Sequence, residues 1–278
     1  MINKISIVVN TCDSYHDVLP IFFSALKEYW PDCKYPIHLN SEYSQFKFNG
    51  LNLKSHTILR NENSAWGHRF KKVINSIKSD YIISLFDDFI LETAVDQKII
   101  SSALYVLESN SKVGVIYLYP ALEGNKNDSL DLFLNVSTLT PYRINSAPAI
   151  WRKTFLNSLL TTSDDPWSWE AFAGYKKLAQ LKKILTIPKN INIAYNYAAS
   201  KGGGIYRGKW VEEVVVKKVK KYNLQLDFSI RGLSTNTNKK KRDIFWKMNF
   251  LFKGFKMVGF KVFYFILFSI IDRIYNKK

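Results

Sequence analysis

Short apolar runs alternate with segments of helically spaced apolar residues along the first half of the chain. The runs are rich in β-branched and aromatic residues, which is typical of strands buried on both faces of a parallel sheet. We therefore predict strands at residues 5–9, 36–39, 57–59, 81–86 and 113–117. The helical spacing predicts helices at residues 18–30, 66–79 and 96–109, with Asp17 as the cap of the first.

This order of elements predicts an α/β fold with a mostly parallel central sheet, in which ligands bind at the carboxyl ends of the strands. The second half is less regular. It predicts a loop at 122–140, helices at 153–160, 167–181 and 211–222, and strands at 184–187 and 193–197. A polar, basic segment at 236–242 predicts the boundary between a domain at 1–238 and an appendage at 239–278.

Composition supports a large folded domain with an anionic partner. The 278 residues are 47% hydrophobic, which excludes a disordered chain and allows a sizeable core. The net charge of +17 is compatible with nucleic acid, anionic lipid or phosphorylated substrates. Eleven Lys/Arg and two Asp lie in residues 239–278, next to a nearly uncharged apolar stretch. That arrangement favours an anionic membrane surface over nucleic acid, which would require basic and aromatic residues interleaved on the folded domain.

The cysteines and the N-terminus predict a cytoplasmic protein. Cys12 and Cys33 form neither a CxxC pair nor a zinc-binding spacing with the four histidines, so we expect two free thiols in a reducing compartment. The apolar run at residues 5–9 is too short for a signal peptide, and the polar residues Asn10 and Asp13 come soon after it.

Two carboxylates come directly after the predicted strand at 81–86. Asp87 and Asp88 therefore stand where an α/β sheet binds its ligands. Hard divalent cations such as magnesium or manganese take oxygen ligands, often one or two carboxylates completed by substrate phosphates. We predict a metal site there. The alternative is a pair of solvated turn residues.

The first strand and the second helix offer further candidates. Thr11 and Asp13 lie in the turn after the first strand, where Asp13 would bond the base or ribose of a nucleotide or, alternatively, cap a helix. Arg69, in the first turn of the helix at 66–79, suits an anionic ligand. Ordinary packing and solvation of this helix start is the other interpretation.

The segment 164–170 places carboxylates around two tryptophans. A flat aromatic ring such as Trp167 or Trp169 fits the apolar face of an acceptor sugar. A neighbouring carboxylate, Glu170 or Asp165, is a candidate general base for an acceptor hydroxyl. Acidic residues at a helix N-terminus would explain Asp165 equally well.

A glycine-rich, basic loop spans residues 201–210. Three successive glycines let the backbone approach a ligand closely, and Lys201, Arg207 and Lys209 supply charge for a diphosphate. The spacing is not that of a P-loop. We predict a lid over the donor, and a flexible surface loop is the alternative.

Taken together, these residues resemble the bacterial GT-A glycosyltransferases of capsule and lipopolysaccharide synthesis, broadly like glycosyltransferase family 2. Three segments of residues 1–235 carry the resemblance: the turn at 11–13, the strand at 81–86 ending in an aspartate pair, and residues 145–152 around Trp151. The pair departs from the family's DxD motif, because Phe86 and Phe89 flank two adjacent aspartates. A non-catalytic assembly protein that keeps the fold is therefore an alternative.

The resemblance implies a metal-assisted, inverting transfer of a sugar from a nucleotide-diphosphate donor. It implies that Asp88 and Asp87 hold the metal, that Trp151 shapes the sugar pocket, and that Glu170 is the catalytic base. The acceptor it implies is a glycan, lipid-linked in view of the appendage.

The appendage predicts peripheral membrane attachment. Residues 262–271 carry no charge, but Lys253, Lys256 and Lys261 interrupt the apolar segment before them. A spanning helix needs about 20 apolar residues, so helices lying in the membrane interface fit better. We expect the protein on the cytoplasmic face of the inner membrane. A terminal helix docked on the core is the alternative.

Overall fold

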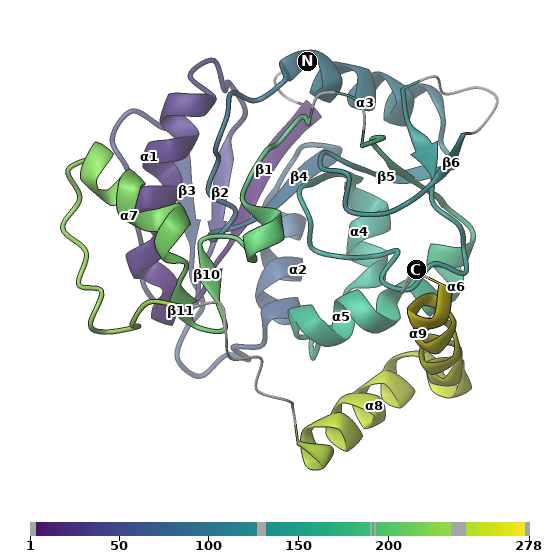
Figure 1. The fold of residues 1–278 in the computed structure, drawn as a ribbon. Helices are drawn as coiled ribbons and strands as arrows, with labels where there is room; N and C mark the ends of the chain where they lie inside the picture. Colours follow the sequence, from purple (N-terminus) through teal and green to yellow (C-terminus); the bar gives the residue numbers. More distant parts are fainter. Residues whose placement is uncertain (1–3, 127–131, 190, 192, 235–242, 276–278) are drawn as a thin grey trace.

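The computed structural model describes residues 4–126, 132–189, 191, 193–234 and 243–275. Its centre is a nine-stranded sheet with helices on both faces (Figure 1). The strand order is β3-β2-β1-β4-β8-β5-β9-β7-β6. The strands are β1 (Ile5–Asn10), β2 (Ile37–Asn40), β3 (Leu53–His56), β4 (Tyr81–Phe86), β5 (Val113–Tyr117), β6 (Asn125–Lys126), β7 (Leu134–Asn135), β8 (Ala149–Arg152) and β9 (Lys183–Thr186).

Most of the central pairings are parallel, as the alternation of elements predicts. Strand β1 pairs in parallel with β2 and β4, β2 with β3, and β5 with β9. Strand β8 is antiparallel to both of its neighbours, β4 and β5. A two-stranded hairpin, β10 (Ile205–Tyr206) and β11 (Lys209–Trp210), lies outside the sheet.

Alternating side chains of the buried strands divide the core between the two faces of the sheet. Ile7 of β1 and Ile83 of β4 pack with helices α1, α3 and α7, whereas Val8 and Ile82 pack with α2, α4 and α5. The helices of the layered core are α1 (Leu19–Tyr29), α2 (Trp66–Ser76), α3 (Gln97–Ser109), α4 (Lys153–Leu159), α5 (Pro166–Phe172), α6 (Lys177–Gln180) and α7 (Glu212–Lys221).

The C-terminal segment forms α8 (Ile244–Val258) and α9 (Val262–Tyr275), which lie outside the layered core beside α5 and α6 (Figure 1). Gly254 of α8 lies so close to Phe172 of α5 that an added Cβ would be 2.5 Å from the ring. Val262 and Phe265 of α9 pack against the same aromatic ring and its neighbours. The predicted boundary at 236–242 and its basic run lie outside the described residues.

Three predictions about elements are wrong. The third strand is β3, because residues 57–59 leave the sheet and Leu59 is 68% exposed. The helix predicted at 167–181 is broken, because Lys176 is extended and its ammonium group turns back to the Leu159 carbonyl oxygen. The segment 193–197 contributes only an isolated bridge between Leu91 and Tyr197.

The predicted helix cap is also wrong. Val18 is the N-cap residue of α1 and its side chain makes no capping hydrogen bond. Asp17 lies in a 3₁₀ turn, Asp13–Val18, and pairs with Arg231, with 2.6 Å between the Arg231 Nη2 and Asp17 Oδ1 atoms.

A histidine pair joins β2 to β3 and predicts a pH dependence of stability. His38 Nδ1 lies 2.8 Å from His56 Nε2, so at least one ring is neutral. Burial, with the charges of His56 and Lys54, lowers the pKa of His38 to about 4, and burial also lowers the pKa of His56. When a histidine has a lower pKa in the folded state than in the unfolded state, the folded protein loses stability as the pH falls below the unfolded-state pKa of about 6.5.

We expect the free energy of unfolding to fall between pH 7.5 and 5.5 by on the order of 1 kcal/mol more in the natural protein than in a His38→Gln, His56→Gln double variant. The change is modest because both rings are only half-buried and solvent screens their charges. Urea unfolding at the two pH values measures the difference. An identical pH response in both proteins would contradict a neutral pair.

Candidate functional site

The carboxyl end of β4 carries the aspartate pair, and a buried asparagine holds that end in place. Asn10, which closes β1, donates from its amide to the Leu85 carbonyl oxygen at 3.2 Å. Its Oδ1 atom accepts from the Trp66 indole at 3.1 Å and from the Asn40 amide at 2.9 Å. Asn10 thus ties β1, β2, β4 and α2 together directly below the candidate site, and sequence reasoning missed it.

Asp87 is buried beneath this edge. Its backbone N–H donates to the Asn10 carbonyl oxygen at 3.2 Å, and the Thr11 hydroxyl donates to its carboxylate. Burial and the neighbouring Asp88 hold the pKa of Asp87 well above its usual range, although the bond from Thr11 opposes the shift. The sequence-predicted residues Thr11 and Asp87 are therefore in direct contact.

Asp88 faces the glycine-rich loop. The Gly204 N–H donates to the Asp88 carbonyl oxygen at 2.7 Å. Gly203 has a φ of +83°, and a Cβ there would be 2.9 Å from the Asp88 carbonyl oxygen and 3.0 Å from its carboxylate. A residue without a side chain is required for this approach and this backbone conformation. The loop thus packs directly on Asp88.

Glu170 of α5 belongs to the same electrostatic neighbourhood. Burial and the charge of Glu170 raise the pKa of Asp88 to about 7, although a backbone hydrogen bond opposes the shift. Burial also raises the pKa of Glu170 itself, against hydrogen bonds from the hydroxyl and the backbone N–H of Ser146, the latter at 2.7 Å. A carboxylate with a raised pKa is suited to accept a proton near neutral pH.

Three tryptophans, among them the residue before Glu170 in α5, form a packed core cluster rather than an open stacking platform. Trp169 packs against Trp66 and Trp151, with ring centroids 5.6 and 5.7 Å apart. Trp151 and Trp169 are 1% and 2% exposed. Trp167, by contrast, is 61% exposed, so of the two predicted acceptor-binding tryptophans it alone lies at the surface.

Asp165 has structural partners. It caps α5 by accepting from the Ser168 N–H at 3.0 Å, and it pairs with Lys253 of α8 at 2.7 Å. Burial raises its pKa, but the bonds from Lys253 and Ser168 outweigh burial and the net shift is downward. These contacts favour a capping role over proton transfer.

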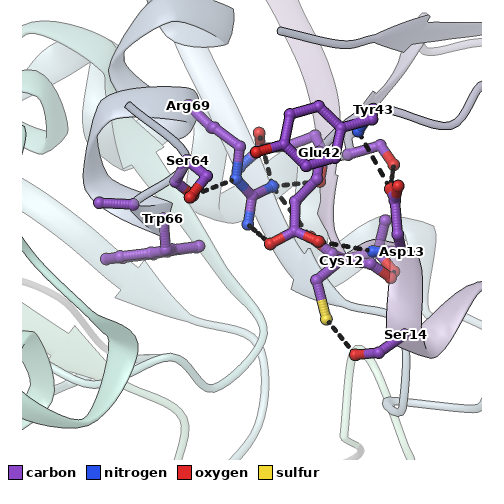
Figure 2. Close-up of polar contacts among 12 residues, drawn as sticks. Cys12, Asp13, Ser14, Glu42, Tyr43, Ser64, Trp66 and Arg69 are labelled. Carbon is purple, nitrogen blue, oxygen red and sulfur yellow. Dashed lines mark hydrogen bonds and ion pairs between the residues drawn. The ribbon is translucent and has the colours of Figure 1, made fainter. Parts of the chain in front are cut away.

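The turn after β1 is held by a second polar cluster, shown in Figure 2. Asp13 accepts from the Tyr43 N–H at 3.1 Å, and its own N–H donates to Glu42 at 3.0 Å. Arg69 is 4% exposed and donates to the Thr11 carbonyl oxygen at 3.0 Å, with Glu42 3.9 Å away. Asp13 and Arg69 thus meet through Glu42, which sequence reasoning missed, and they shape the edge of the site from beneath.

Basic residues gather beside the turn after β1. Arg207, in the turn between β10 and β11, lines a cavity of about 520 Å³ together with Asp13, Lys209 and Arg231. Arg231 also lies 4.3 Å from the Tyr15 ring centroid, and its charge acts to lower the pKa of Asp87. No local pattern pointed to Arg231, since some 140 residues separate it from Asp88.

Lys201 lies at the start of the glycine-rich loop. Its ammonium group pairs with Glu213 of α7 at 2.5 Å, and this ion pair raises its pKa. Lys201 therefore ties the loop to α7.

The aspartate pair fits a divalent cation that completes its shell with substrate oxygens. Within the described ranges, no three His, Cys, Asp or Glu side chains are grouped as a complete metal site. Magnesium is usually held by one or two carboxylates with substrate phosphates and water, and two adjacent carboxylates at a strand end supply that donor set.

No protein-family model and no curated protein matches the sequence. Solved structures match in fold. TarS 1-349 from S. aureus aligns with 93% of this chain and 82% of its own, with a TM-score of 0.51 and 14% identity. The same protein in complex with UDP gives a TM-score of 0.51 at 14% identity, and in complex with UDP-GlcNAc 0.50 at 13%, over the same shares of both chains. The fold is therefore a mixed α/β fold similar to that of the GT-A transferases.

Proposed function

We propose that this protein is a glycosyltransferase that moves a sugar from a nucleotide-diphosphate donor to an acceptor hydroxyl. One observation carries the proposal: just past the carboxyl end of a central strand, Asp88 packs against a glycine-rich loop and its pKa is raised by the charge of Glu170. Ligands of such sheets bind at this edge. The complexes of TarS with UDP and UDP-GlcNAc support a nucleotide sugar as the donor for the shared fold.

The donor would bind between the turn after β1 and the loop at 201–210. Thr11 and Asp13 border the nucleoside side, and Arg207 supplies positive charge for the diphosphate. Asp88 and Asp87 would hold a manganese or magnesium ion, whose chemistry here is neutralisation of charge on the leaving diphosphate. Trp151 supports the sugar pocket from the core.

The reaction we propose is a direct displacement with inversion. The acceptor hydroxyl oxygen forms a bond to the anomeric carbon, the bond from that carbon to the diphosphate breaks, and the hydroxyl proton passes to the Glu170 carboxylate. The raised pKa of Glu170 suits this transfer. Asp165 is the second candidate base, but its ion pair with Lys253 favours the ionised, capping form.

We further propose that α8 and α9 attach the enzyme to the cytoplasmic face of the inner membrane, in cell-surface polysaccharide synthesis. By length and composition alone, the stretch Ile244–Ile271 contains a segment apolar enough to cross a bilayer. Gly259, with a φ of +60°, breaks it into two helices. Because each helix falls short of the roughly 20 residues that a span needs, we favour helices in the membrane interface.

Asp88→Asn should abolish metal-dependent donor binding. The amide keeps the size of the side chain but removes the charge that binds the cation. We therefore expect the rate of metal-dependent hydrolysis of the nucleotide sugar to fall by about 100-fold or more. The measurement is Mn²⁺-dependent hydrolysis of a panel of nucleotide sugars, with thermal stabilisation by UDP and Mn²⁺ as a second readout.

Asp80→Asn is the matched control, because Asp80 is an exposed aspartate at the opposite end of β4. Equal activity of Asp88→Asn and Asp80→Asn would show that the metal does not bind at this pair.

Glu170→Gln should lower turnover by roughly 10²- to 10⁴-fold with little change in donor affinity, because the amide cannot accept the hydroxyl proton. Turnover with saturating donor and calorimetric binding of UDP with Mn²⁺ separate the two effects. Asp165→Asn, on the same helix, is the comparison. A larger loss of turnover in Asp165→Asn would move the base to that residue.

Glutamates placed on the outer face of α8 and in the turn between α8 and α9 should release the protein from anionic vesicles. Phe245 and Phe260 are 74% and 78% exposed, so Phe245→Glu with Phe260→Glu leaves the packed face intact. We expect at least about tenfold weaker sedimentation with phosphatidylglycerol vesicles. The control is Leu59→Glu, at an exposed position far from α8 and α9 in sequence, and this variant should bind the vesicles normally. Undiminished binding of the double variant would place the attachment elsewhere.

A further inference from the structure

A large groove is lined by residues of both the core and the two C-terminal helices. It has a cavity volume of about 1430 Å³ and lies between α5, the segment at 137–142, and the helices α8 and α9. Figure 1 shows these helices beside one another at the edge of the layered core. A volume of this size exceeds what most small-molecule sites enclose, which run to about 1,000 Å³.

Three kinds of chemistry line this one groove. Glu170, the candidate base beside Asp88, forms part of its core wall, with the exposed Trp167 nearby. Lys247 contributes a cation from α8. The remaining wall on the helix side is mainly apolar and comprises Trp246, Phe250, Leu251, Phe265, Phe268 and Ile271.

The charges of the groove are complementary to an anionic amphiphile. Of the charged side chains that line the groove besides Glu170, Glu123 pairs with Lys189 at 3.1 Å, whereas no ion pair joins Lys247 to any side chain that the structure describes. An anion in the groove would therefore find a cation at Lys247 and an apolar wall beside it. A purely polar glycan would leave the apolar wall exposed to water, whereas a lipid chain would cover it.

We propose that this groove binds the acceptor, and that the acceptor is an amphiphile with an anionic group between its apolar chain and its sugar. The reacting hydroxyl lies at Glu170, the anionic group pairs with Lys247, and the chain lies along α8 and α9. The inference rests on the proposed function and assigns the helices a second role: their outer face meets the bilayer, and their inner face forms part of the acceptor site.

Binding of simple amphiphiles to the full chain tests the inference without donor or turnover. Butyl, octyl and dodecyl phosphate, each below its micelle concentration, are titrated against the protein by calorimetry. We expect affinity to rise about two- to fourfold per added methylene until the apolar wall is covered. Dodecyl β-glucoside, which lacks the anion, should bind at least about fivefold more weakly than dodecyl phosphate.

Two variants of one helix locate the chain. Phe268→Asp changes the groove wall, and Phe263→Asp places the same charge on the exposed face of α9, where Phe263 is 59% exposed. We expect at least a tenfold loss of dodecyl phosphate affinity in the first and less than a twofold change in the second. Equal losses would mean adsorption to the outer face and would overturn the proposal.

Lys247→Glu removes the cation without touching the packed face, and it should cancel the preference for dodecyl phosphate over dodecyl β-glucoside. An unchanged preference would contradict the role of Lys247. Thermal unfolding of each variant checks the fold, and UDP binding with Mn²⁺ checks the donor site separately. Donor binding without any chain-length effect overturns this inference alone, whereas groove binding without donor binding overturns the proposed function alone.

Discussion

The register between β1 and β4 determines the geometry of the whole candidate site. Because Asn10 lies opposite Phe86 in this parallel pair, the next residues along each strand, Thr11 and Asp87, emerge side by side and form a hydrogen bond. The buried Asn10 amide secures the register from below through β2, β4 and α2. A slip of one residue would turn the side chains of one strand to the opposite face and separate Thr11 from Asp87.

The aspartate pair follows β4, whereas the candidate base Glu170 comes from α5, which is distant in sequence. Trp66, Trp151 and Trp169 come from α2, β8 and α5, and they pack into one cluster on one face of the sheet. That cluster sets where α5 lies and therefore how far Glu170 is from Asp88. In the proposed reaction, the buried tryptophans would act by positioning a carboxylate, which is a different role from sugar stacking.

Periodicity was sufficient for β1, β4 and β5 and for the long amphipathic helices, and so for the placement of Asp87 and Asp88 after β4. It failed where tertiary contacts override local pattern. The edge strand β3 is largely polar and has no apolar run. Strand β8 has only four residues, and no sequence pattern indicates that it lies antiparallel between β4 and β5. Asn10, Glu42 and Arg231 acquire their roles only through partners distant in sequence, so composition and spacing did not reveal them.

The contact between Gly254 and Phe172 has a consequence for acceptor length. Because α8 has no side chain at this point, its backbone rests on an aromatic ring of the same helix that carries Glu170. A domain attached to a bilayer through α8 would then hold Glu170 at one fixed height above the lipid. In the proposed enzyme, an acceptor that is too short would not arrive at the carboxylate, and one already extended would carry its hydroxyl past it.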